Sequence, residues 1–343
     1  ISMDAIPRIA RAQSMDALSS MSSIGGYKSV LIGANALGRY LPMMTTAAGT
    51  LKAGKVLVLG AGVAGLQAIA TARRLGAQVT AFDIRPEVKE QVESLGATFL
   101  EEEPELSEER PPEAPAEASD GSEAERATGL SAAVAWLRDV FELGNGSGPG
   151  AAEDAEAGAD GKGAKQADDE EGGASAGGYA REQAEDKQQR DRELIRARLR
   201  DVDLVITTAL VPGKRAPVLL TADMVEAMRP GSVVVDLAAE AGGNCELTRA
   251  GEVVEHELIH IHGPKNLPSG MPEDASRLYS HNVVSLLSHL AEEGELTLDL
   301  EDEITDAVVL AHRGEIRSAA VREALGEEPA GSGATGGSGG GTT

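Results

Sequence analysis

The stretch Val56-Leu-Val-Leu-Gly60-Ala-Gly62-Val-Ala-Gly65 decides the fold, because it sets a G-x-G-x-x-G turn between an apolar strand and an alanine-rich helical run. A second apolar run, Gln78-Val-Thr-Ala-Phe82, ends at Asp83, 18 residues after Gly65. A lone G-x-G-x-x-G is weak evidence, but strand, tight turn, helix, strand and acid in this order are typical of a dinucleotide-binding βαβ unit. The alternative is a βαβ turn that binds nothing, and the context disfavours it.

Each glycine of this turn has its own expected role. Gly60 permits the tight turn, Gly62 lets the backbone approach a pyrophosphate, and Gly65 lets the helix pack closely on the strand. The helix N-terminus offers free N–H groups and a positive dipole end to phosphates. Asp83 can accept from a ribose hydroxyl and would repel a 2′-phosphate, which favours NAD over NADP. Arg85, two residues later, weakens that preference.

Composition narrows the class of protein. The chain has 343 residues, enough for two modest domains, and a net charge of −25. This acidity disfavours a nucleic-acid surface and fits a protein adapted to high salt. Residues 101–178 hold 21 acidic and 5 basic side chains, so 21 − 5 = 16 of the excess negative charges lie there. One cysteine, Cys245, excludes an internal disulfide and suits a reducing cytosol.

Targeting and membrane signals are weak in this sequence. No run approaches about 18 consecutive apolar residues, so no membrane span of its own is expected. No signal peptide is visible. The first residue is Ile1 rather than methionine, so we expect that an upstream part is missing.

The pattern along the chain predicts an α/β fold with a doubly wound parallel sheet (Rossmann) and a long disordered acidic insertion. A helix is expected over residues 17–42, ended by Pro42. The second half of the sheet is expected in three strands (203–208, 232–236, 257–262), with helices at 180–200, 222–228 after an N-cap at Thr221, and 275–293.

These elements suggest six parts. They are a polar loop and a linking helix (1–42), the first half of the Rossmann domain (43–100), the acidic low-complexity insertion (101–176), the second half of that domain (177–270), a C-terminal helical segment (271–330) and a flexible tail (331–343). Within the insertion, an apolar island around Trp136 is interpreted as a short helix on the nearest domain or, less favoured, as a partner-docking helix.

A polar segment precedes the first long helix. Arg8-Ile-Ala-Arg-Ala-Gln13-Ser-Met-Asp16-Ala-Leu-Ser19-Ser20 holds two guanidiniums, an amide, a carboxylate and three hydroxyls. An elaborate helix cap is the simplest interpretation, but Arg8, Gln13 and Asp16 exceed what a cap requires. A nicotinamide carboxamide and its ribose need this mix of donors and acceptors.

With this loop and the glycine turn, the chain resembles the NAD(H)-binding alpha subunit of proton-translocating NAD(P) transhydrogenase, in the alanine dehydrogenase/transhydrogenase family. The likeness lies in Pro42-Met-Met-Thr-Thr-Ala-Ala-Gly49, Gly65-Leu-Gln-Ala-Ile-Ala-Thr-Ala72, Lys89-Glu-Gln-Val-Glu-Ser-Leu-Gly96, Thr207-Thr-Ala-Leu-Val-Pro-Gly-Lys214 and Asp236-Leu-Ala-Ala-Glu-Ala-Gly-Gly-Asn-Cys245. It covers nearly everything except residues 101–176 and the tail. The resemblance implies that residues 1–42 are the loop and linking helix of a first, mostly missing domain, the remnant of a second α/β domain. It also implies that residues 177–270 include a mobile loop and that residues 271–330 return to the first domain.

The resemblance implies that NADH bound here passes a hydride directly to NADP⁺ on a partner domain, coupled to proton movement through a membrane partner. By the same resemblance, Arg8, Gln13 and Asp16 position the nicotinamide end, with support from Ser19 and Tyr27. Ala61, Gly62 and Val63 would meet the pyrophosphate, and Asp83, Ile84 and Arg85 the adenosine end. Gly178 and Tyr179 resemble a mobile loop that closes over the nucleotide, and Thr208, Ala209 and Leu210 follow a strand's carboxyl end.

The resemblance also implies a homodimer that docks, through its NADP(H)-binding and membrane-spanning partners, on the cytoplasmic side of the inner (plasma) membrane. Two alternatives stay open. An alanine-dehydrogenase-like enzyme would need a substrate-handling lysine and histidine in the first domain. A non-catalytic NAD-binding protein would use the acidic insert as an interaction arm.

His260 and His262 share a strand face, but no nearby cysteine or carboxylate pattern supports a metal site.

Overall fold

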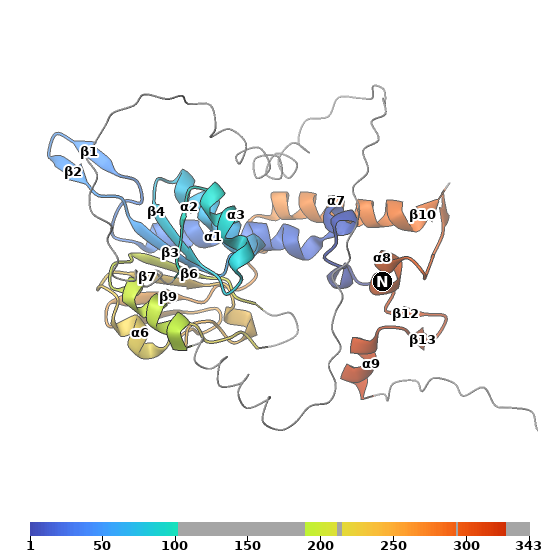
Figure 1. The fold of residues 1–343 in the computed structure, drawn as a ribbon. Coiled ribbons are helices and arrows are strands. Elements are labelled where there is room, and N and C mark those ends of the chain that lie inside the picture. Colours follow the sequence, from blue (N-terminus) through green and yellow to red (C-terminus); the bar gives the residue numbers. More distant parts are fainter. Residues whose placement is uncertain (102–188, 211–214, 293, 327–343) are drawn as a thin grey trace, which may run out of the picture.

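The computed structural model describes residues 1–101, 189–210, 215–292 and 294–326 (Figure 1). Its centre is a seven-stranded sheet in the order β5-β4-β3-β6-β7-β9-β8, in which all neighbouring strands are parallel except β8 and β9. The strands are β3 (Lys55–Leu59), β4 (Gln78–Phe82), β5 (Thr98–Phe99), β6 (Leu204–Thr207), β7 (Val233–Asp236), β8 (Val253–His256) and β9 (Ile259–His262). This order confirms the predicted doubly wound α/β fold.

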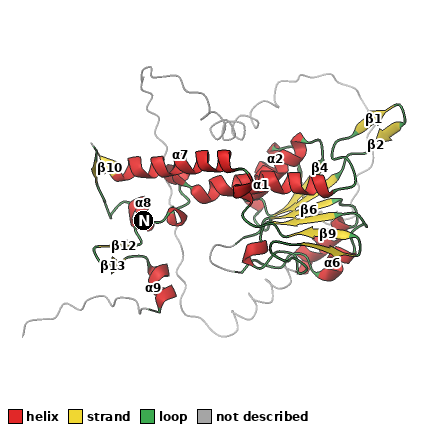
Figure 2. Ribbon diagram, turned by 180° about the vertical axis from the view of Figure 1, so that it is seen from behind, coloured by secondary structure: helices red, strands yellow, loops and turns green. Residues whose placement is uncertain are grey.

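Helices cover both faces of the sheet (Figures 1 and 2). One face packs on α1 (Ala17–Ala36), α2 (Val63–Arg74) and α3 (Lys89–Ser94), and the other on the helical residues 189–199 and α6 (Ala222–Glu226). All four residues of β6 and of β7 are buried. Central strands covered on both faces must be continuously apolar, which explains runs such as Leu204-Val-Ile.

Helix α1 approaches the sheet and α2 very closely because of its glycines. A Cβ on Gly26 would lie 2.1 Å from the backbone oxygen of Ala64, in the first turn of α2. A Cβ on Gly33 would lie 2.5 Å from the Leu204 side chain. This helix is shorter than the predicted span of 17–42, because it ends at Ala36. The next residue, Leu37, is extended, with a ψ of 136°, and its side chain is buried in the core.

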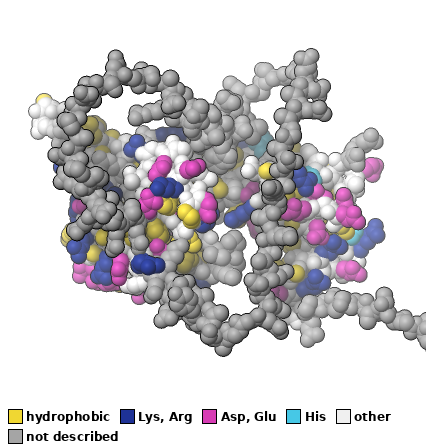
Figure 3. Space-filling model, in the orientation of Figure 1, with side chains coloured by type: hydrophobic (Ala, Val, Ile, Leu, Met, Phe, Trp, Pro, Cys, Tyr) yellow, Lys and Arg dark blue, Asp and Glu magenta, His cyan; other side chains and the backbone are white. Residues whose placement is uncertain are grey.

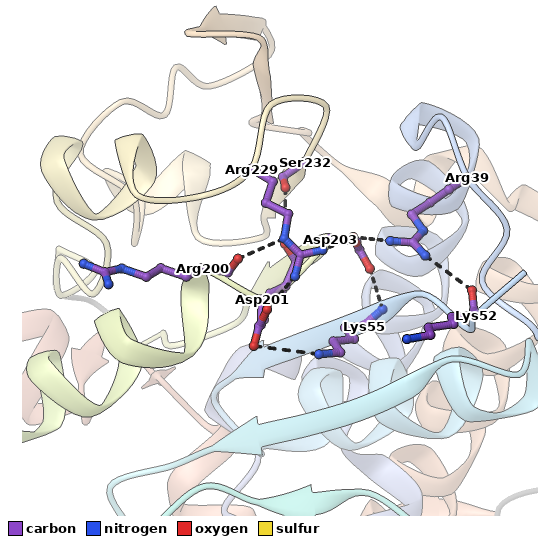
Figure 4. A network of polar contacts seen from close by, with 9 residues as sticks. Arg39, Lys52, Lys55, Arg200, Asp201, Asp203, Arg229 and Ser232 are labelled. Atoms are coloured by element: carbon purple, nitrogen blue, oxygen red, sulfur yellow. Dashed lines mark hydrogen bonds and ion pairs between the residues drawn. The ribbon is translucent and has the colours of Figure 1, made fainter.

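A polar network fastens the amino ends of the central strands (Figure 4). The Asp203 carboxylate, 8% exposed, accepts from Arg39 Nη1 at 2.7 Å and from the Lys55 amide at 2.8 Å. Arg229 Nη2 pairs with Asp201 at 2.6 Å. The loop after α1 and the starts of β3 and β6 are thus held together at this edge.

A smaller unit lies beside the sheet domain and contains both the first residues and the C-terminal elements. Helix α7 (Pro272–Leu290) runs along α1, as both ribbon views show. An apolar cluster joins Ile6, Ala12 and Met15 to Leu286, Leu290 and Ile304. The remaining elements are η1 (Met3–Ala5), η2 (Ala10–Met15), β1 (Met44–Thr46), β2 (Gly49–Leu51), η3 (Pro86–Val88), η5 (Ala239–Ala241), η6 (Leu267–Gly270), β10 (Ala291–Glu292), β11 (Glu295–Leu296), α8 (Glu303–Val308), β12 (Ala311–His312), β13 (Glu315–Ile316) and α9 (Ala319–Leu325).

Several boundaries differ from those that the sequence predicts. The strand expected over 257–262 is present as β9, which begins two residues later, and it forms a hairpin with β8, a strand that the sequence did not predict. The helix expected over 275–293 runs from Pro272 to Leu290, and that expected over 222–228 ends at Glu226. The insertion at 101–176, with its apolar island, and the tail fall almost entirely outside the described residues. Among the helices that are described, none is both long and apolar enough to cross a membrane.

Both signs of charge are present on the surface of the described part. In the face shown in Figure 3, Lys and Arg side chains lie among Asp and Glu side chains rather than in a separate patch.

Candidate dinucleotide-binding site

Three strand ends meet at one point of the sheet. Leu59, the last residue of β3, pairs in register with Phe82 of β4 on one side and with Thr207 of β6 on the other. Gly60, Asp83 and Thr208 are therefore the next residues of three adjacent strands. In open α/β sheets, ligands bind outside the carboxyl ends of the strands, where the strand order reverses. The strand order β4-β3-β6 reverses here.

Gly60 and Gly65 have the backbone geometry and the close packing expected of this turn. Gly60 has a φ of +100°, in the region that favours glycine. A Cβ on Gly65 would lie 1.9 Å from the Gly60 oxygen, so α2 can pack here only with glycine. Gly62 is exposed and is the N-cap of α2 with no side-chain cap, and a Cβ on it would meet nothing within 4 Å. The open side of the turn thus presents the backbone of α2's first residues.

Asp83 is tied to the glycine turn and to Arg85. Its carboxylate accepts from the Ala61 amide at 2.7 Å and from Arg85 Nε and Nη2 at 2.9 and 3.0 Å. The Asp83 side chain is 7% exposed, and the Arg85 side chain 55%. Burial raises the pKa of Asp83, but hydrogen bonds from Arg85 and Ala61 outweigh that effect and hold the pKa below its ordinary value. Asp83 is thus an anion beside the turn.

The segment after β6 is held partly by residues for which the sequence suggested no role. Thr208 Oγ1 donates to the Gly60 oxygen at 3.0 Å. Asn244, fully buried, accepts from the Ala209 amide at 3.0 Å and donates to the Ala209 oxygen at 2.8 Å. The backbone of Asn244 is held in place in turn, because its backbone N–H donates to the buried Asp236 carboxylate at 2.8 Å. A buried carboxylate directly after an apolar strand was the available signal for this network.

Asp236 is the centre of that network. Its carboxylate is fully buried and accepts five hydrogen bonds, from Thr207 and Thr248 hydroxyls and from the amides of Ala238, Asn244 and Cys245. Buried polar networks with all members satisfied rigidify a site. The neighbouring Cys245 is 1% exposed, and burial raises the pKa of its thiol to about 11.

The upstream polar loop lies at the start of α1. Asp16 is the N-cap of α1, and its carboxylate accepts from the Ser19 amide at 2.9 Å and from the Ser19 hydroxyl at 2.5 Å. The side chains of Arg8 and Gln13 are exposed and form no hydrogen bond or ion pair with any residue that the structure describes. Asp16 and Ser19 thus form a helix cap, whereas the side chains of Arg8 and Gln13 make no polar contact within the described part of the chain.

The structure brings most of the predicted site residues to two places. Gly60, Ala61, Gly62, Val63, Gly65, Asp83, Ile84, Arg85, Thr208, Ala209 and Leu210 lie around the glycine turn. Asp16 and Ser19 lie at the first turn of α1, Gln13 lies in the preceding η2, and Arg8 lies just before η2. Tyr27, on α1 beside the glycine that touches α2, is partly exposed. Gly178 and Tyr179 lie outside the described residues.

A hollow of about 300 Å³ lies at the other edge of the sheet. It is lined by Lys55, Arg73 and Arg198, at the amino ends of the strands. The glycine turn is nevertheless the better candidate, because the ligand-binding edge of this fold is the carboxyl edge. An extended ligand that lies in an open groove also needs no closed cavity.

The strand order, the glycine turn that opens α2 and the acid at the end of β4 together define a Rossmann-type dinucleotide-binding domain.

Comparison with known proteins places the chain further. The family model "Alanine dehydrogenase/PNT, C-terminal domain" matches residues 29–319, and the chain belongs to this family. It is 40% identical over 318 residues to NAD(P) transhydrogenase subunit alpha of Haemophilus influenzae, covering 92% of this chain and 49% of that protein. It is 38% identical over 319 residues to NAD(P) transhydrogenase subunit alpha of Cereibacter sphaeroides, again covering 92% and 49%. The chain thus spans about half the length of these relatives.

Solved structures agree with this placement. A transhydrogenase from Sinorhizobium meliloti superposes with a TM-score of 0.63 at 37% identity, over 92% of this chain and 67% of that one. An L-alanine dehydrogenase superposes with a TM-score of 0.51 at 22% identity, over 90% and 64%, which supports the shared fold alone. The resemblance predicted from the sequence is confirmed.

Proposed function

We propose that this chain is the NAD(H)-binding component of a proton-translocating NAD(P) transhydrogenase. The single observation that carries the proposal is the pairing of a glycine turn with a separate polar loop through one helix: Gly26, in the middle of α1, lies against the first turn of α2, and Asp16 caps the N-terminus of α1. The 38–40% identity to subunits named as transhydrogenase alpha supports it.

The residues present fit a dinucleotide. The first turn of α2 has no side-chain cap, so its N–H groups and the positive end of the helix dipole remain available to a pyrophosphate. Gly62 leaves open space where phosphate oxygens would approach. Asp83, anionic and next to Ala61, would accept from the adenosine ribose and disfavour a 2′-phosphate. Ile84 and Leu210, 66% and 52% exposed, would then cover the adenosine end.

The nicotinamide end is assigned to the upstream loop. Arg8 and Gln13 offer a guanidinium and an amide that no described residue engages, and both face solvent. Asp16 is fixed by the Ser19 amide and hydroxyl, so its carboxylate has a set direction. When bound, NADH would supply the hydride chemistry itself. These side chains then orient a ring, and the protein supplies no acid, base or nucleophile.

The same proposal includes partners. The NADP(H)-binding and membrane-spanning transhydrogenase components would receive the hydride and couple the exchange to proton movement, with a homodimer of this chain docked on the cytoplasmic side of the membrane. The name "subunit alpha", which these relatives carry, supports assembly with other subunits. Gly178 and Tyr179, which lie outside the described residues, keep their proposed role in binding the nucleotide.

One experiment tests the proposal. The purified protein is mixed with the NADP(H)-binding component of a transhydrogenase, and exchange between NADH and a thio-analogue of NADP⁺ is followed by absorbance. Transfer that needs both proteins and no third substrate is the expected result. Oxidation of NADH that requires pyruvate and ammonia would instead establish the alanine-dehydrogenase-like alternative. Binding of NADH with no exchange at any ratio of the two proteins would leave a non-catalytic NAD-binding protein.

A further inference from the structure

The upstream loop contains a helical turn that is too short to fix its own orientation. Residues Ala10–Met15 form a single 3-10 segment, and its N-cap Ile9 provides no side-chain hydrogen bond. Isolated short helices are marginal because each turn fixes several dihedral angles for few hydrogen bonds. Ala12 and Met15 are buried in the cluster with α7 and α8, whereas Gln13 is exposed between them. Apolar contacts hold the segment down, but they are non-directional.

Asn282 on α7 supplies the directional contact. Its Nδ2 donates to the backbone oxygen of Ser14 at 2.8 Å, and the two residues are 268 positions apart in sequence. Asn282 is 5% exposed whereas Ser14 is exposed, so the bond is partly buried, with its donor side away from water. Ser14 lies between Gln13 and Asp16, and the bond therefore fixes the backbone from which both side chains project.

The second polar atom of the Asn282 side chain lowers the stability of the fold. Its Oδ1 is buried and has no hydrogen-bond partner among the residues that the structure describes. A buried acceptor without a donor costs free energy, and an aliphatic side chain of similar shape would avoid that cost. The presence of asparagine at position 282 is thus better explained by its hydrogen bond to the Ser14 backbone than by packing in the core.

A second contact ties the same loop to α8. Arg11 Nη2 pairs with Asp302 Oδ2 at 2.9 Å, and His289 of α7 lies 3.0 Å from Asp302 Oδ1. Hydrogen bonds from the Thr305 amide and from Arg11 hold the pKa of Asp302 below its ordinary value, so the carboxylate stays charged. The Arg11 side chain is 61% exposed, and exposed ion pairs contribute little, so the bond from the buried Asn282 side chain is the stronger restraint.

We propose that Asn282 is a positioning residue for hydride transfer: by holding the Ser14 carbonyl it orients Gln13 and Asp16 toward the nicotinamide ring. This inference rests on the proposed function. It predicts a specific division of effects, because Asn282 bonds the backbone of the upstream loop and not that of the glycine turn. Loss of the bond would then impair orientation of the ring while leaving the grip on the pyrophosphate intact.

The test uses Asn282→Leu, which keeps a γ-branched side chain while removing the donor and the unpaired acceptor, and Asn282→Ala as the second variant. Val225→Ala is the matched control. Val225 is fully buried where α6 packs on the sheet, outside the apolar cluster that contains Ala12 and Met15. Each protein is measured for thermal unfolding, for NADH affinity by fluorescence titration, and for hydride exchange with the NADP(H)-binding component. Amide hydrogen exchange of the ligand-free proteins is measured over residues 10–16 and 60–66.

For both Asn282 variants, exchange of hydride should slow at least about tenfold, equivalent to about 1.4 kcal/mol, while the Kd for NADH changes less than about threefold. Amide exchange should accelerate over residues 10–16 and stay unchanged over 60–66. Val225→Ala should lower the unfolding temperature without either effect.

Unchanged hydride exchange in both Asn282 variants would overturn the inference and leave the proposed function standing. A parallel loss of binding, exchange and stability, shared with Val225→Ala, would also overturn it, since Asn282 would then be structural. If wild-type protein transfers no hydride, the proposed function fails. In that case the amide exchange of residues 10–16 still decides whether Asn282 orients the loop.

Discussion

The glycine turn contains two glycines whose substitution should have opposite consequences, and Gly62→Ala is the sharper of the two tests. Gly62 has φ of −76°, which alanine adopts freely, and an added Cβ would meet nothing within 4 Å. Loss of glycine's freedom in the unfolded chain stabilises by about 0.4–1 kcal/mol. Alanine is a poorer N-cap than glycine by an amount of similar size. The free energy of unfolding should therefore change by less than about 1 kcal/mol.

Binding of NADH should respond very differently. The new methyl group would occupy the space through which phosphate oxygens reach the first amides of α2. Loss of one hydrogen bond to a charged group costs about 1.5–3 kcal/mol, which corresponds to a roughly 10- to 100-fold weaker Kd. Fluorescence titration with NADH measures this change, and calorimetry measures the stability.

Two further variants complete the design. Gly65→Ala would place its Cβ 1.9 Å from the Gly60 oxygen, where only backbone can move, so it should destabilise by about 1–3 kcal/mol or more. Gly38→Ala is the matched control, because its Cβ would meet nothing within 4 Å and it lies outside the turn. A folded Gly62→Ala protein with wild-type affinity for NADH would refute the placement of the pyrophosphate at α2.

Three other outcomes follow from the same geometry. Gly26→Ala should destabilise more than Gly33→Ala, because Gly26 faces Ala64 backbone at 2.1 Å whereas Gly33 faces a movable Leu204 side chain; calorimetry showing the reverse order would contradict the packing of α1 on α2. Asp83→Asn should raise the affinity for NADPH relative to that for NADH by about tenfold or more. In the wild-type protein, the pKa of Asp83 is held below its ordinary value. The wild-type affinity for NADH should therefore stay flat above about pH 5 and fall only as Asp83 is protonated at lower pH. The Cys245 thiol, with its pKa raised to about 11 by burial, should resist iodoacetamide at pH 8 in the native protein and react after unfolding; rapid native labelling would show that Cys245 is accessible.

The sheet could be predicted from sequence because its signals are local. Apolar runs such as Val56–Leu59 and Val233–Val235 stand between glycine turns and polar segments, and strand-helix alternation permits few topologies. The hairpin β8–β9 was missed for a local reason too. Its turn residues, Glu257 and Leu258, have positive φ of 49° and 65°. Such turns usually carry Asn-Gly or Gly, so these residues carry no turn signal and one strand was expected instead of two.

The sequence could indicate which residues lie together, but not which residues hold them in place. Gly60, Asp83 and Thr208 could be placed together, because each follows a strand and parallel strands end at the same edge. The residues that hold the site could not be found in this way. Asn244 bonds backbone 35 residues away, and Asn282 bonds backbone 268 residues away. A side-chain bond to distant backbone leaves no periodicity or motif in the sequence.

The two ends of the proposed site belong to different apolar cores, and α1 connects them. Val30 and Leu37 pack in the core under α2, while Met15, just before α1, packs in the cluster with α7 and α8. About ten residues separate Asp16 from Gly26, so a straight helix sets these levels about 15 Å apart. Because Gly26 is pressed against the Ala64 backbone, α1 cannot slide along α2 without a clash. The spacing between the polar loop and the glycine turn is therefore set by rigid backbone rather than by flexible side chains. Under the proposed function, this rigid spacing would fix where the nicotinamide end of a bound dinucleotide lies relative to its pyrophosphate.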